Sequence, residues 1–165
     1  MTVEFEDYSV KVLDAIEGCA YDFLEGAAAE VESEAKRNSD FAPRSLKPDW
    51  KHIVDEGKKE ATVGHPKELA LWMEKGTGEF AIGGDGRKGY WIYIEGQGSS
   101  AGSNSKSYAT LEEAKKAMRF LREEKGLPAH ITKGHRPMRM LESAFVTKQP
   151  TIIKLAERIF GEGMS

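Results

Sequence analysis

Apolar residues recur at steps of three and four over a long run near the start of the chain. They fall at Val10, Leu13, Ile16, Ala20, Phe23, Ala27, Val31 and Ala35. This spacing places one apolar stripe on a helix, so we predict a long amphipathic helix over residues 8–36. A helix cannot continue through the following stretch, which contains Pro43 and Pro48, and we predict a loop over residues 38–48.

The pattern then changes to short apolar runs separated by polar turns. We expect strands at 50–54 and 60–63, joined by a turn, and a short helix at 68–73. A further strand is expected to begin at 80–82. Residues 90–94, Tyr-Trp-Ile-Tyr-Ile, are the strongest strand signal in the chain.

A second helical pattern begins after the Gly/Ser-rich stretch 95–106. Thr110 and Glu113 form a capping box for a helix that Gly126 and Pro128 end, and a short strand follows at 129–132. Residues 90–132 therefore predict a strand–helix–strand unit. A parallel return of its second strand would make the unit a right-handed crossover.

The last part of the chain predicts a C-terminal helical region that extends to Phe160. Pro137 suits its first turn, and Pro150 is expected to interrupt or kink it. The predicted fold class is α+β. A small, mostly antiparallel sheet packs against the two long helical regions, in one domain over 1–165 with an insertion at about 83–134.

Composition excludes some classes and leaves one asymmetry. Apolar runs are too short for a membrane span, and Cys19 is the only cysteine, so no internal disulfide can form. Residues 1–34 carry ten acids and one base, whereas residues 106–139 carry nine bases and four acids. These are either ordinary solvated faces or complementary surfaces for a partner or a second copy.

Candidate chemistry is sparse. Gly84, Gly86 and Gly89 fit a dinucleotide-binding spacing, but a strand follows them where that motif requires a helix. The four histidines lack metalloprotease spacing. We therefore expect no catalytic, cofactor-binding or metal-binding residue. The basic helix at 115–125 is interrupted by acids and matches no nucleic-acid motif, so nucleic-acid binding is not expected.

Two short motifs carry a family resemblance. They are Glu74-Lys75-Gly76-Thr77, after the predicted helix 68–73, and Arg136-Pro137, before the terminal helix. Together with the long first helix, they resemble the gene-product-ten-like tail-component family of long-tailed bacteriophages, the tail completion or head–tail joining proteins. The chain departs from that family in the inserted unit at 83–134.

The resemblance implies a non-enzymatic virion protein at the tail or head–tail junction, assembled in the cytoplasm of a host bacterium. Members of that family form rings, often hexameric, between the tail tube or its terminator and the head connector. We predict a subunit interface that includes two aromatic and three basic side chains: Trp91, Tyr93, Lys115, Lys116 and Arg119. The alternatives are a small adaptor or regulatory protein that binds protein or nucleic acid through the strand–helix–strand unit, and an enzyme of a type not recognised.

Overall fold

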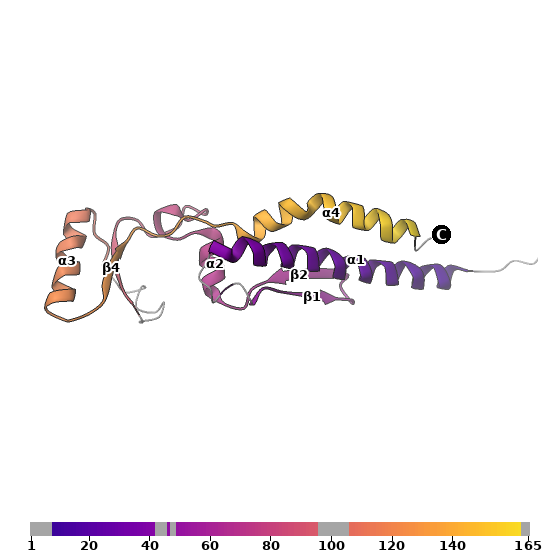
Figure 1. The fold of residues 1–165 in the computed structure, drawn as a ribbon, viewed down its shortest axis with the longest axis horizontal. Helices are drawn as coiled ribbons and strands as arrows, with labels where there is room; N and C mark the ends of the chain where they lie inside the picture. Colours follow the sequence, from indigo (N-terminus) through magenta and orange to yellow (C-terminus); the bar gives the residue numbers. More distant parts are fainter. Residues whose placement is uncertain (1–7, 42–45, 47–48, 96–105, 163–165) are drawn as a thin grey trace, which may run out of the picture. The chain divides into compact units, whose positions relative to one another are not determined.

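A computed structural model of the protein describes residues 8–41, 46, 49–95 and 106–162. The chain divides into two compact units (Figure 1), Met1–Ala70 with Met140–Ser165, and Leu71–Arg139. The predicted α+β class is confirmed, since the described helices accompany two small antiparallel sheets of two strands each. The strands thus form two separate pairs, where the sequence suggested one sheet. The predicted insertion at 83–134 lies entirely within the second unit, and its reading as part of one domain stays a prediction.

The first unit is built on two helices that run side by side, α1 (Ser9–Asn38) and α4 (Met140–Glu162). An antiparallel hairpin of β1 (Lys51–Asp55) and β2 (Glu60–Gly64) packs against α1. Its strands lie within a residue of their predicted positions. The helix α2 (Glu68–Lys75) follows, and the boundary between the units falls within it.

The core of the first unit lies where α1 ends and α4 begins. Trp50 is 2% exposed, and its indole Nε1 donates to the hydroxyl of Ser39 at 2.7 Å. That hydroxyl in turn donates to the Ala35 carbonyl at 2.7 Å, and the Asn38 amide donates to the Met140 carbonyl at 2.9 Å. A buried serine thus ties the C-terminus of α1 to the strand that follows, with its polar group fully used.

Two expectations for the C-terminal helix, its start at Pro137 and an interruption at Pro150, are wrong, whereas a kink at Pro150 stays a prediction. The helix begins at Met140 and not at Pro137, because Arg139 has a left-handed φ of 49°, which no helical residue adopts. It also continues without interruption through Pro150. Proline leaves the carbonyl four residues earlier without its helical donor, but Val146 and Pro150 are both exposed, so water can satisfy that carbonyl.

The second unit contains the predicted strand–helix–strand order. The strands β3 (Trp91–Ile94) and β4 (Ala129–Thr132) flank α3 (Leu111–Glu123) in sequence, and the Thr110 hydroxyl accepts from the Glu113 amide as predicted. The strands pair antiparallel, Trp91 opposite Thr132, so the unit is not a parallel crossover. A 3-10 turn, η3 (Gly78–Phe80), takes the place of the strand expected at 80–82.

Candidate functional site

The two motifs that carry the family resemblance meet in the second unit, although about sixty residues separate them. The backbone N–H of Thr77 donates to the His135 carbonyl at 2.9 Å, and the Thr77 hydroxyl accepts from the His135 amide at 2.9 Å. Next to them, Met138 donates to the Met73 carbonyl at 2.8 Å and Glu79 to the Lys133 carbonyl at 3.0 Å. We call this pairing of residues 73–79 with 133–139 the motif junction.

Glycine is required at the centre of the motif junction. Gly76 is buried, with a φ of 73°. A Cβ there would lie 2.8 Å from the His135 carbonyl oxygen and 2.9 Å from Cδ of Pro137. The motif glycine therefore serves close approach of two chain segments, and Pro137 is one of the groups that it approaches. The geometry gives both residues a structural role.

Charged and aromatic side chains surround the motif junction. The Lys133 ammonium lies 3.2 Å from Glu79 and 4.5 Å from the centre of the Tyr90 ring. The Arg136 guanidinium lies 5.5 Å from the centre of the Phe80 ring. The hydrogen bond from Lys133 lowers the pKa of Glu79, and the same bond raises the pKa of Lys133. The Lys133 and Glu79 side chains are 36% and 34% exposed, and ion pairs open to water to this extent add little to the stability of the fold.

The structure separates the predicted interface residues into two groups. Trp91 and Tyr93 alternate with the buried Ile92 along β3 and so lie on the opposite face of the sheet. Tyr93 stacks on His130 with ring centres 5.3 Å apart, and the Arg87 guanidinium lies 5.2 Å from the centre of the Trp91 ring. The Trp91 ring is therefore partly engaged within its own unit.

The basic members of the predicted interface lie on α3. This helix packs against the β3–β4 sheet, and its Ala114 is fully buried. Lys116 and Arg119 are exposed, and Lys115 forms an ion pair with Glu112 at 3.2 Å. Phe120, which the sequence pattern did not single out, is 55% exposed beside these bases. The aromatic members thus lie on a strand and the basic members on a helix, and whether either group contacts a partner stays a prediction.

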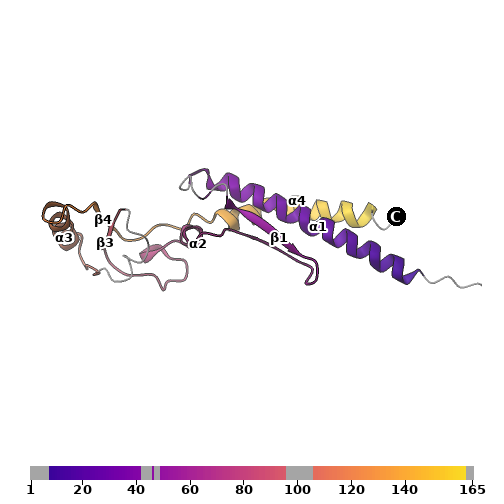
Figure 2. The same cartoon turned by 90° about the horizontal axis from the view of Figure 1, so that it is seen from below.

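Sequence reasoning missed an exposed apolar surface at the N-terminal end of α1. Val10, Leu13 and Ile16 begin the stripe that was expected to pack, but they are 68%, 60% and 37% exposed. The stripe becomes buried only further along, at Val31 and Ala35. Figure 2 shows the N-terminal end of α1 diverging from α4. The periodicity identified the stripe correctly but could not show which part of it is covered.

A histidine between two carboxylates is a second feature that the sequence did not reveal. The Nδ1 atom of His52 lies 2.6 Å from Glu32 and its Nε2 atom lies 3.0 Å from Glu25, which joins β1 to α1. The hydrogen bond to Glu25 raises the pKa of His52, and the bond to Glu32 acts in the same direction against the effect of burial. An imidazolium donates from both nitrogens, so this arrangement favours the protonated ring.

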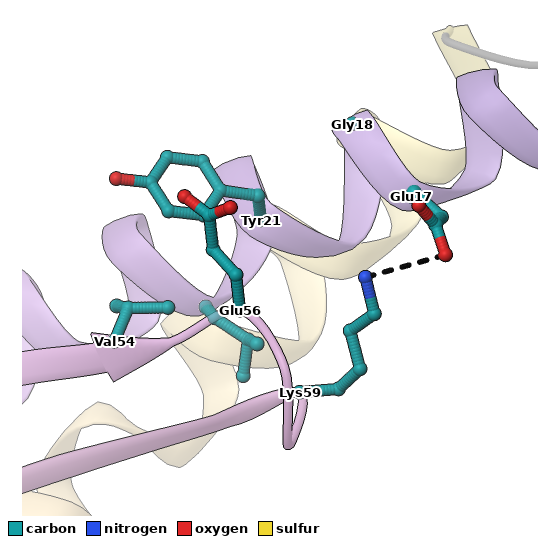
Figure 3. Close-up of a pocket in the computed structure, with 7 residues that line it drawn as sticks. Glu17, Gly18, Tyr21, Val54, Glu56 and Lys59 are labelled. Atoms are coloured by element: carbon teal, nitrogen blue, oxygen red, sulfur yellow. Dashed lines mark ion pairs between the residues drawn. The ribbon is translucent and has the colours of Figure 1, made fainter.

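A shallow pocket of about 290 Å³ lies between α1 and the hairpin (Figure 3). Lys59 extends from the hairpin toward Glu17 of α1, and their charged atoms are 3.5 Å apart. Tyr21 and Val54 contribute apolar surface to its wall. The pocket is small and open, and its one ion pair is exposed, so it does not indicate a catalytic centre.

No similar known protein assigns a function to these surfaces. In the described ranges, no cluster of three or more histidine, cysteine or acidic side chains could hold a metal ion. None of the helices in the described part of the chain is long and apolar enough to cross a membrane. Comparison of the chain with known protein families, with characterised proteins and with solved structures found no match.

Proposed function

We propose that the protein is a non-enzymatic structural component of a phage or prophage virion, of the tail completion or head–tail joining type. In this role, copies of the chain form a ring between the tail tube and the head connector. The observation that carries the proposal is the motif junction. The segments around Gly76 and Pro137, chosen for their resemblance to that family, form one main-chain pairing with a glycine that no other residue could replace without strain.

The exposed surfaces support an assembly role over a catalytic one. Apolar side chains at the N-terminal end of α1 are open to solvent, and such patches commonly mark protein contact sites. The charge asymmetry between the acidic first helix and the basic α3 offers complementary surfaces for neighbours. Head-to-tail contacts between identical subunits close into a ring when the rotation permits.

The proposal is tested with the proteins that would flank the chain in a virion. We expect the purified protein to bind tail tube, tail terminator or head connector proteins encoded beside its gene, and to form rings visible by negative-stain electron microscopy. The control is a tail-fibre protein from the same source. The proposal fails if neither rings nor binding to those neighbours is seen.

A second candidate, an adaptor that binds through the second unit, is favoured by the exposed Phe120 on the basic α3. Reversing Lys115, Lys116 and Arg119 together separates the two functions in part, since it should weaken ring assembly if α3 faces a neighbour. Binding of nucleic acid that falls steeply with salt, and is lost in the same variant, would favour the adaptor.

A further inference from the structure

The first ten residues of α1, Ser9–Gly18, form an extension that precedes Cys19, whose thiol donates to the Ile159 carbonyl of α4 at 3.8 Å. At 1.5 Å per residue, the extension is roughly 15 Å of helix, and each of its residues is exposed. We call this segment the α1 tip. Covering its exposed apolar stripe with a partner removes apolar surface from water, which is favourable.

A second surface, a groove, lies along the seam between α1 and α4. Its volume is about 560 Å³. It is lined by small, apolar and charged side chains from both helices: Gly26, Ala29, Glu30, Thr151, Lys154, Leu155 and Arg158. Gly26 has no side chain, and Leu155 of α4 fills that space, since a Cβ at Gly26 would lie 2.9 Å from Leu155 Cδ2. We call this surface the seam groove.

The charges of the seam groove are predominantly positive. The carboxylate of Glu30 already lies 2.7 Å from Lys148. Lys154 and Arg158 are one turn apart on α4, and within the described residues neither has a carboxylate partner. Two cations therefore border an apolar floor, with one acid already neutralised.

The α1 tip complements the seam groove in polarity and in charge. Asp14 lies at one edge of the stripe of Val10, Leu13 and Ile16. Glu17 lies on the same face as the stripe, seven residues after Val10 and four after Leu13. Asp14 has no basic partner in the described part of the chain, and Glu17 has only the exposed Lys59 at 3.5 Å. A helix face that combines apolar side chains with two acids matches a groove edged by bases, and an amphipathic helix in a groove is a common mode of protein binding.

The tip cannot occupy the groove of its own chain. Residues 9–18 and the groove residues Gly26 and Ala29 belong to the same continuous helix, so the tip would have to fold back on itself. We propose that the α1 tip of one copy docks into the seam groove of the next copy. The inference rests on the proposed function only in that copies of the chain contact one another. Because tip and groove are different surfaces, the contact is head-to-tail, and it forms rings or open chains.

The first test compares two single variants of the full chain by sedimentation across a concentration series. Leu13→Asp should weaken self-association at least about tenfold, as expected for an apolar anchor at the centre of a contact. Val146→Asp is the matched control, because Val146 is a similarly exposed helical residue, at 62%, outside tip and groove. Equal loss in both variants would overturn the assignment, as would a wild-type chain that stays monomeric at every concentration.

The second test is a charge exchange that does not depend on the apolar anchor. The tip variant Asp14→Lys and the groove variant Lys154→Glu/Arg158→Glu should each self-associate about tenfold more weakly than wild type. Mixed together, they should recover association, because a positive tip then meets a negative groove and a negative tip meets a positive groove. Helical circular dichroism checks that each variant is folded.

The outcomes separate this contact from the proposed function. If the mixture does not recover, docking of tip into groove is wrong. If the charge-exchange variants assemble normally and only the reversal of Lys115, Lys116 and Arg119 prevents it, rings form through α3 and the proposed function stands without this contact. If copies associate as described here but bind no tail or connector protein, the contact stands and the virion role fails.

Discussion

Replacing Ser39 by alanine tests whether one buried hydroxyl holds the core of the first unit together. Ser39 is 1% exposed, and its hydroxyl accepts from the Trp50 indole while donating to the Ala35 carbonyl. After Ser39→Ala, the Ala35 carbonyl keeps a donor, the backbone N–H of residue 39. The Trp50 N–H, which is almost inaccessible to water, loses its one acceptor among the residues that the structure describes.

The expected cost follows from that asymmetry. A buried donor without a partner costs about 1–3 kcal/mol, so we expect Ser39→Ala to lower the free energy of unfolding by about 2 kcal/mol. In a Trp50→Phe background no donor is left unpaired, and the same serine change should cost less than about 1 kcal/mol. The coupling between the two sites is therefore about 1 kcal/mol or more.

Urea unfolding followed by helical circular dichroism measures these differences. The signal reports mainly the first unit, because α1 and α4 contain 30 and 23 residues against 13 in α3. With a urea dependence of about 2 kcal/mol per molar, a loss of 2 kcal/mol lowers the midpoint by about 1 M. The control is Ser143→Ala on the exposed face of α4, which should change stability by less than about 0.5 kcal/mol. Equal costs of Ser39→Ala in both backgrounds would refute the reasoning.

Three further predictions concern single positions. The hydrogen bond to Glu25 raises the pKa of His52 above 6.5, so the stability that this contact gives is present below that pH and is lost as pH rises through the folded-state pKa. In urea titrations, His52→Gln should lower the free energy of unfolding by about 1–2 kcal/mol near pH 5.5 and by less near pH 9. An equal loss at both pH values would contradict the paired imidazolium. Gly76→Ala should destabilise the second unit by about 2 kcal/mol or more, seen as faster amide exchange in residues 73–79, whereas Gly57→Ala, which meets only a side-chain oxygen at 3.4 Å, should leave that exchange unchanged. Gly18→Ala should raise helix stability by up to about 1 kcal/mol, because no atom lies within 4 Å of the added Cβ. A lower midpoint of thermal unfolding would instead show that the added methyl group meets a contact in the folded chain.

Much of the fold was predictable because it depends on local sequence. Apolar spacing indicated α1 and α3, and the capping box at Thr110 marked the start of α3 correctly. The turn between β1 and β2 was equally clear. These elements follow from periodicity and from side chains that bond to their own neighbours, so the sequence by itself determined them.

Other features depend on contacts between distant residues, and only the tertiary structure decided them. The meeting of Thr77 with His135, the bridge from His52 to α1 and the antiparallel return of β4 have no local signal. Proline was misleading at Pro150, because its cost depends on whether water reaches the freed carbonyl. The stripe on α1 shows the limit most directly. Its apolar spacing is the same at Leu13 as at Val31, but one side chain is exposed and the other is buried, because periodicity defines a face whereas burial needs a second surface to cover it.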